Sequence, residues 1–219
     1  MNKILYWSPF TSKVATIKSV IDSVYSVNKY LHNQFKASII DAVDEWGSYK
    51  NILNSKGIEV IKLNKKTVFN SFTKDGFLKS RIAYLYIFFK SIFPLHNLIK
   101  NDKPKFLIIH LITSLPLFLF ISQKYETKLI LRISGLPKMT FFRKILWKFA
   151  IKKIYKITCP TMDTYKDLSK FEFLKEKLVV LKDPIINSSD IKKIKLKEVN
   201  IPKDAKEIIS NNDFFLSIG

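Results

Sequence analysis

The sequence is poor in several residue types, and each shortage excludes a class of protein. A single cysteine, Cys159, excludes an internal disulfide and fits a reduced, cytoplasmic setting. With three histidines besides, a dedicated zinc site is not expected. Only five glycines are present, and neither a G-x-x-x-x-G-K-[ST] loop nor a G-x-G-x-x-G turn occurs. The usual fingerprints for nucleoside triphosphates and dinucleotides are therefore absent, as is the G-x-S-x-G nucleophile elbow.

Acidic residues and arginine are also scarce. The chain has 18 Asp and Glu against 38 Lys and Arg, a formal charge of +20, and its only arginines are Arg81, Arg132 and Arg143. Such an excess predicts an anionic partner, either a phosphorylated substrate, an anionic membrane or nucleic acid. Proteins that recognise nucleic-acid sequence usually need arginine for bidentate contacts with bases, and no RNA- or DNA-binding motif is present. Nucleic acid is thus the least favoured of the three.

Short apolar runs alternate with helical patterns along the chain. The runs expected to be strands are 3–10, 37–43, 58–64, 105–111, 128–134, 156–160 and 177–181. Helices are expected at 12–31 with Ser12 as N-cap, 49–56 with Gly57 as stop signal, 77–100 with a break near Pro94, 114–124, 139–156, and after a Thr161 cap. Continuous apolar strands are typical of a covered parallel sheet. The predicted fold class is α/β, a doubly wound Rossmann-like sheet of about seven parallel strands with helices on both faces.

Two segments bear on membranes and export. The first residues lead directly into a short apolar run without a small-residue cleavage site, so no signal peptide is expected. Segment 106–122 is long and apolar, but its 17 residues are at the short limit for a span, and His110 and Pro116 interrupt it. A buried strand that runs into a buried helix explains this segment better.

Several stretches together resemble a known family. The order of elements, the stretch KLVVLKDPII and the terminal FFLSIG are similar to the N-terminal half of a retaining glycosyltransferase of the GT-B fold, of the "glycosyl transferases group 1" type. The family's Asn-Pro-Val type motif is matched here by Asp183, Pro184 and Ile185. WSPF…ATIKSVIDSV also resembles the opening of transferases from polysaccharide and lipopolysaccharide clusters. The resemblance implies transfer of a sugar from a nucleotide-sugar to a glycan or lipid-linked acceptor in cell-surface polysaccharide synthesis, without metal or cofactor.

The same resemblance implies a division into domains. Residues 1–187 would be an acceptor-side Rossmann-like domain, 188–212 a lysine-rich linker, and 213–219 the first strand of a donor-binding domain that this chain lacks. The chain alone is then expected to be inactive, with the missing domain as its partner. The family often carries a Gly-Gly loop after the first strand, where this sequence has Pro9 to Lys13.

Ligands of doubly wound sheets bind beyond the carboxyl ends of the strands, so these ends supply the candidate site. His110 follows the fourth strand, where family members often hold a histidine near the acceptor and the reacting sugar. It is the predicted catalytic residue, and the alternative is a buried histidine. Arg132 is predicted to contact an anion or a sugar hydroxyl, and the alternative is an ion pair at the sheet edge. The remaining predicted donor or acceptor contacts are Ser8, Thr11, Ser12, Lys13, Thr113, Ser114 and Ser134.

For two segments, residues 8–13 and the helix at 139–156, the sequence leaves two alternatives open. Residues 8–13 precede the first helix, whose N-terminal amides can hold an anion, although ordinary capping explains them equally well. The basic aromatic helix at 139–156 is predicted either to lie on an anionic membrane or to turn its aromatics toward the sheet. The predicted membrane contacts are Phe142, Arg143, Lys144, Trp147, Lys148 and Lys152. The expected location is cytoplasmic, peripheral on the inner face of the cell membrane. The rival function is a non-catalytic basic module that binds anionic membrane or nucleic acid.

Overall fold

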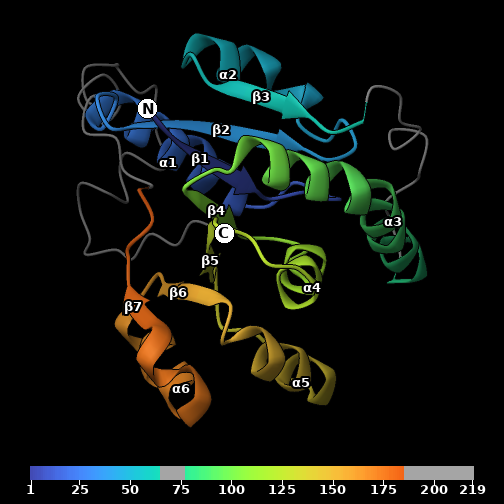
Figure 1. Cartoon of the computed structure of the whole chain (residues 1–219), viewed down its shortest axis with the longest axis vertical. Helices are drawn as coiled ribbons and strands as arrows, with labels where there is room; N and C mark the ends of the chain where they lie inside the picture. Colours follow the sequence, from blue (N-terminus) through green and yellow to red (C-terminus); the bar gives the residue numbers. More distant parts are fainter. Residues whose placement is uncertain (65–76, 185–219) are drawn as a thin grey trace, which may run out of the picture. The chain divides into compact units, whose positions relative to one another are not determined.

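Seven parallel strands form one sheet in the order β3-β2-β1-β4-β5-β6-β7 (Figure 1). The computed structural model describes residues 1–64 and 77–184. The strands are β1 (Asn2–Trp7), β2 (Phe35–Asp41), β3 (Glu59–Lys62), β4 (Phe106–Ile109), β5 (Lys128–Arg132), β6 (Ile154–Cys159) and β7 (Leu178–Val180). The predicted fold class is confirmed. The expected linker at 188–212 and the expected strand at 213–219 lie outside the described residues.

The strand order reverses direction between β1 and β4, and this switch point determines where a site can form. Trp7 at the end of β1 is in register with Ile40 of β2 and Ile109 of β4. The backbone amide of His110 donates to the carbonyl of Trp7 at 3.0 Å, which continues the ladder by one bond. His110 therefore lies at the carboxyl edge, at the switch point where doubly wound sheets bind ligands.

Helices cover the two faces of the sheet separately. They are α1 (Thr16–Tyr30), α2 (Lys50–Ser55), α3 (Phe77–Asp102), α4 (Ser114–Ser122), α5 (Phe141–Ala150) and α6 (Met162–Ser169), with 3₁₀ turns η1 (Gly47–Tyr49) and η3 (Glu172–Lys177). Ile4 and Tyr6 of β1 belong to the core under α1 and α2. Their neighbours Leu5 and Trp7 point the other way, into the core shared with α3, α4, α5 and α6.

Several local predictions are confirmed. Gly57 follows α2 with φ +62°. This left-handed conformation often ends helices, and glycine adopts it without steric strain because it has no Cβ atom. The Thr161 hydroxyl caps α6 by accepting from the amide of Thr164 at 3.1 Å. Segment 106–122 forms β4 and α4 rather than a span. Among the residues described, only α3, between Arg81 and Asp102, is long and apolar enough to cross a membrane by length and composition.

Three predicted boundaries are wrong. Helix α1 begins at Thr16 without a side-chain cap, so Ser12 does not cap it; the chain before it forms turns at the sheet edge instead. Helix α3 continues through Pro94 because the buried Ser91 and Leu95 on either side keep it packed on the sheet. Helix α5 ends at Ala150, four residues before β6 begins, because the residues from 154 onward enter the core as a strand.

Candidate functional site

Three hollows lie along the carboxyl edge of the sheet and share their walls. A hollow of about 530 Å³, here called the β2 hollow, lies between the loops that follow β1 and β2. A second of about 700 Å³, the His110 hollow, lies between α5 and the loops that follow β4 and β5. A small hollow of about 90 Å³ shares residues 10–12 with the first, and Tyr84, Leu111 and Ile112 with the second. The three therefore form one groove across the switch point.

The His110 hollow gathers most of the residues predicted from the sequence. Its lining includes His110 and Thr113 from the loop after β4, Ser114 from the start of α4, and Arg132 and Ser134 from the end of β5 and the residues after it. The hollow also contains Gly135, where the backbone can be approached closely because nothing lies near the place of a side chain. Three hydroxyls and one imidazole therefore surround a single space, an arrangement suited to a polyhydroxylated ligand.

His110 is held in its neutral form. Its side chain is 6% exposed, and neither ring nitrogen has a hydrogen-bond partner among the residues the structure describes. Burial, and then repulsion by the nearby Arg132 guanidinium, lower the pKa of His110 well below its ordinary value of 6.5. At neutral pH the ring therefore has one nitrogen able to accept a hydrogen bond and one able to donate.

The loop that carries His110 is backbone-strained. Ile112 has φ +46°, a conformation that a β-branched residue rarely adopts. The Trp7 indole holds this turn by donating to the Ile112 carbonyl at 3.0 Å. Strain of this kind persists only where surrounding contacts impose it, and it concentrates at binding and catalytic sites. It therefore agrees with a functional role for the loop.

Arg132 is already paired within the protein. Its Nε donates to Oδ1 of Asp183 at 3.0 Å, Nη2 contacts the same oxygen, and Nη1 donates to the Ser23 hydroxyl at 3.0 Å. Oδ2 of Asp183 accepts from the Ser19 hydroxyl at 3.3 Å. The structure therefore shows the ion-pair alternative, because the forked face of the guanidinium is directed at α1 and Asp183 rather than at a ligand.

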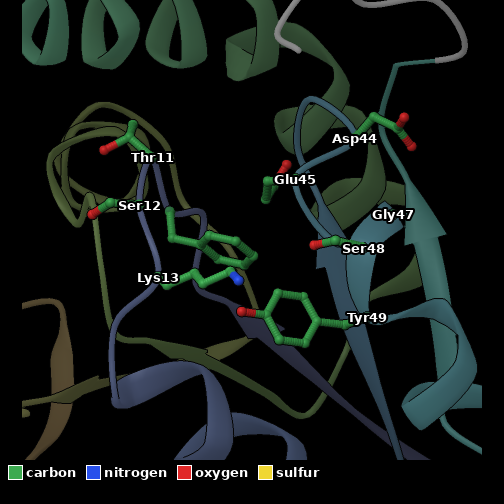
Figure 2. Close-up of a pocket in the computed structure, with 9 residues that line it drawn as sticks. Thr11, Ser12, Lys13, Asp44, Glu45, Gly47, Ser48 and Tyr49 are labelled. Atoms are coloured by element: carbon green, nitrogen blue, oxygen red, sulfur yellow. The ribbon is translucent and has the colours of Figure 1, made fainter. Parts of the chain in front are cut away.

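The β2 hollow has polar walls on both sides. Figure 2 shows Thr11, Ser12 and Lys13 on one wall, facing Tyr49 and its neighbours on the other. The side chains of Lys13 and Tyr49 point toward one another across the opening. Ser8 is fully buried and is not among the residues that line this hollow.

Two buried carboxyl groups behind this hollow were not predicted. Oε1 of Glu45 accepts from the amide of Ala42 at 3.1 Å and Oε2 from that of Val43 at 2.7 Å, which closes the loop after β2. Burial, and then the neighbouring Asp41, raise the pKa of Glu45 well above its usual value. The signal was present in the sequence, because Asp41 lies near the end of the predicted strand 37–43 and Asp44 and Glu45 follow that strand directly.

The predicted membrane residues are only partly at the surface. Phe142, Arg143, Lys144 and Lys148 of α5 are exposed. Trp147 is 3% exposed and packs into the core, so its predicted contact with a membrane is wrong in this structure. Lys152 lies in the turn that follows α5 and not on the helix. Trp147 thus faces the sheet and Phe142 faces outward, and membrane contact by the exposed residues stays a prediction.

Comparisons with known proteins show the fold alone. No family model and no curated protein sequence matches the chain. Among solved structures, UDP-GlcNAc 2-epimerase from Neisseria meningitidis bound to UDP-GlcNAc is 14% identical with a TM-score of 0.61, over 94% of this chain and 52% of that one. MurG from Acinetobacter baumannii is 9% identical with a TM-score of 0.52, over 87% of this chain and 47% of that one.

A third structure adds a transferase to these neighbours. The lipopolysaccharide outer core galactosyltransferase WaaB, in its apo form, is 10% identical with a TM-score of 0.53, over 85% of this chain and 47% of that one. The chain therefore spans about half the length of the structures that it resembles. At these sequence identities the similarity shows that the chain shares the fold of about half of each neighbour. It does not show which reaction the chain supports, so that question must be argued from the residues of the site.

Proposed function

We propose that this chain is the acceptor-side half of a glycosyltransferase that moves a sugar from a nucleotide-sugar to a glycan or lipid-linked acceptor in cell-surface polysaccharide synthesis. The grouping of His110 with the hydroxyls of Thr113, Ser114 and Ser134 around one hollow at the switch point supports this function. The structural neighbours, which include a galactosyltransferase and a UDP-GlcNAc 2-epimerase, point to the same class of substrate.

In this proposal His110 orients the acceptor. A neutral imidazole can accept a hydrogen bond from an acceptor hydroxyl and so raise its nucleophilicity as the bond to the sugar forms. The hydroxyl side chains of Thr113, Ser114 and Ser134 would bind other sugar hydroxyls. The leaving diphosphate would be stabilised by a second, donor-binding domain.

A nucleotide-sugar epimerase is the second candidate, since several neighbours carry that name. Epimerisation at a carbon atom requires groups that remove a proton and return one on the other face. None of the described residues that line the His110 hollow has a carboxyl group, and its only imidazole is that of His110. Transfer to a hydroxyl, which needs a single polarising group on the acceptor side, fits this lining better.

Several further features belong to the proposal. The enzyme would work without metal or cofactor, in the cytoplasm, peripherally on the inner face of the cell membrane. The exposed Lys144 and Lys148 of α5 would contribute to membrane contact. A non-catalytic basic module is the rival, favoured only by the formal charge of +20.

The test uses an enzyme in which this chain is followed by a donor-binding domain. Transfer of radiolabelled sugar from nucleotide-sugars to oligosaccharides and to lipid-linked glycans is measured. His110→Ala is expected to lower kcat about 10²- to 10⁴-fold while the melting temperature changes little. His32→Ala, which removes an exposed imidazole from α1's end, is the matched control. Normal turnover by His110→Ala, or formation of an epimer in place of a transfer product, would contradict the proposal.

A further inference from the structure

Helix α3 is apolar on the side that faces away from the protein. Ile82, Leu85, Phe89 and Phe93 are between 54% and 74% exposed. Their spacing of three and four residues places them in one stripe along the helix. The opposite side of the same helix is in the core, where Ile87 is completely buried. Large exposed apolar side chains on the outer side of a helix that is already packed on the core need a second apolar environment.

The stripe continues onto the neighbouring helices. Figure 1 shows α3, α4 and α5 one after another along the same side of the sheet. Phe88 of α3 contacts both the exposed Phe89 and Phe118 of α4, with ring centroids 5.6 and 5.9 Å apart. At α5 the exposed Phe142 shares the wall of the His110 hollow with Tyr84 of α3. The apolar surface is therefore continuous from α3 to the mouth of this hollow.

Apart from Asp102 at the end of α3, every charged residue of these three helices is basic. Between Arg81 and Lys100, α3 has three basic residues and no acidic one, and α4 has no charged residue. Helix α5 adds Arg143, Lys144 and Lys148, again with no acidic residue. Large exposed aromatics beside cations are the composition of helices that lie in the interface of an anionic bilayer.

We infer that α3 is the main membrane-docking element of this protein, with its outward stripe inserted into the interface of an anionic bilayer. The helix lies on the bilayer and does not cross it, because its inner side is packed on the sheet. Phe118 and the aromatics of α5 extend the contact, and the cations hold the lipid headgroups. In this orientation the His110 hollow opens at the membrane surface. This docking is independent of whether the protein transfers a sugar.

Vesicle flotation of the 219-residue chain tests the inference. The vesicles are phosphatidylcholine alone, or phosphatidylcholine with about 30% phosphatidylglycerol, a mixture that provides the anionic surface. The triple variant Leu85→Gln, Phe89→Gln, Phe93→Gln is expected to lose about a hundredfold in partitioning into anionic vesicles, because three large apolar side chains no longer enter the interface. The loss should persist at low salt, since it is apolar in origin.

A control variant removes exposed apolar surface elsewhere. Tyr30→Gln, Leu31→Gln, Ile52→Gln changes three exposed apolar residues at the end of α1 and on α2, helices that cover the other face of the sheet. This variant should bind as the wild type does. Circular dichroism verifies folding, and light scattering measures the oligomeric state. Unchanged flotation of the α3 variant would overturn the inference. So would a wild-type dimer that the α3 variant converts to monomers without loss of lipid binding, since the stripe would then be an interface between copies.

Discussion

Removing the carboxylate of Asp183 should destabilise the protein far more than removing a surface charge. The side chains of Arg132 and Asp183 are only 6% and 13% exposed, so Asp183→Asn leaves a buried guanidinium without a counterion. The Ser23 hydroxyl would still accept a hydrogen bond from Nη1 of Arg132, but it carries no charge. Breaking a buried ion pair from one side costs about 3–5 kcal/mol, because the other charge stays desolvated. We expect a loss of about 3 kcal/mol in the free energy of unfolding.

Urea denaturation measures this loss. With a denaturant slope of about 2 kcal/mol per molar, a typical value for a domain of this size, the midpoint should fall by about 1.5 M. The double variant Arg132→Met, Asp183→Asn should recover part of the loss, because neither buried charge remains. The pair Lys103–Glu126 is the control, since its 2.7 Å bridge joins side chains that are 60% and 75% exposed. Coupling there should stay below about 1 kcal/mol. If Asp183→Asn shifted the midpoint no more than Glu126→Gln does, the argument from burial would be refuted.

Three further outcomes follow from single residues. Because the pKa of His110 is lowered in the folded state, its contribution to stability is complete above about pH 6.5 and decreases below that pH by up to about 1.4 kcal/mol per pH unit. The urea midpoint should therefore differ less between pH 7.5 and pH 5.5 for His110→Gln than for the wild type. An equal difference in the two proteins would contradict this. Burial raises the pKa of Cys159 to about 11, so alkylation by iodoacetamide at pH 8, followed by mass spectrometry, should be very slow until urea unfolds the chain. Gly57→Ala should cost about 1 kcal/mol in urea denaturation, because alanine must adopt φ +62° there; an unchanged midpoint would count against that strain.

The fold could be predicted because its signals are local. A parallel strand buried on both faces appears as a short apolar run, and each of the seven observed strands lies within or overlaps a predicted run. Gly57 marks the end of α2 through its own backbone conformation. Thr161 marks the start of α6 because its hydroxyl accepts from the amide of Thr164, three residues later. Boundaries were less accurate where tertiary packing decides them. The end of α5 is the clearest case, since nothing in the basic aromatic stretch 139–156 shows that the helix ends at Ala150 and that the chain joins the sheet at Ile154.

The site was predictable only at the level of strand ends. The rule that ligands bind beyond the carboxyl ends of parallel strands identified His110, Thr113 and Ser134, and the structure places all three around one hollow. Applied to β2 as well, the same rule would have identified Asp41 and Glu45. The rule cannot identify partners, however. Arg132 and Asp183 are 51 residues apart in the sequence, and only the paired ends of the sheet bring them together. A conspicuous arginine therefore indicates an anion without showing whether that anion is a ligand or a carboxylate of the protein.

Helix α3 shows the corresponding limit for apolar residues. A helical stretch that is apolar on all sides has two physical solutions, because complete burial and partial insertion into lipid both remove its surface from water. The sequence pattern is the same in either case. The structure separates them by placing Ile87 and Leu95 in the core while Phe89 and Phe93 remain outside. The outward pair makes no contribution to the core, and leaving two phenylalanine rings in water forgoes roughly 1.5–3 kcal/mol of burial for each ring. Contact with a bilayer would recover that free energy, which is the physical reason for inferring that the outer face of α3 is the main docking surface and that the lysines of α5 add to it.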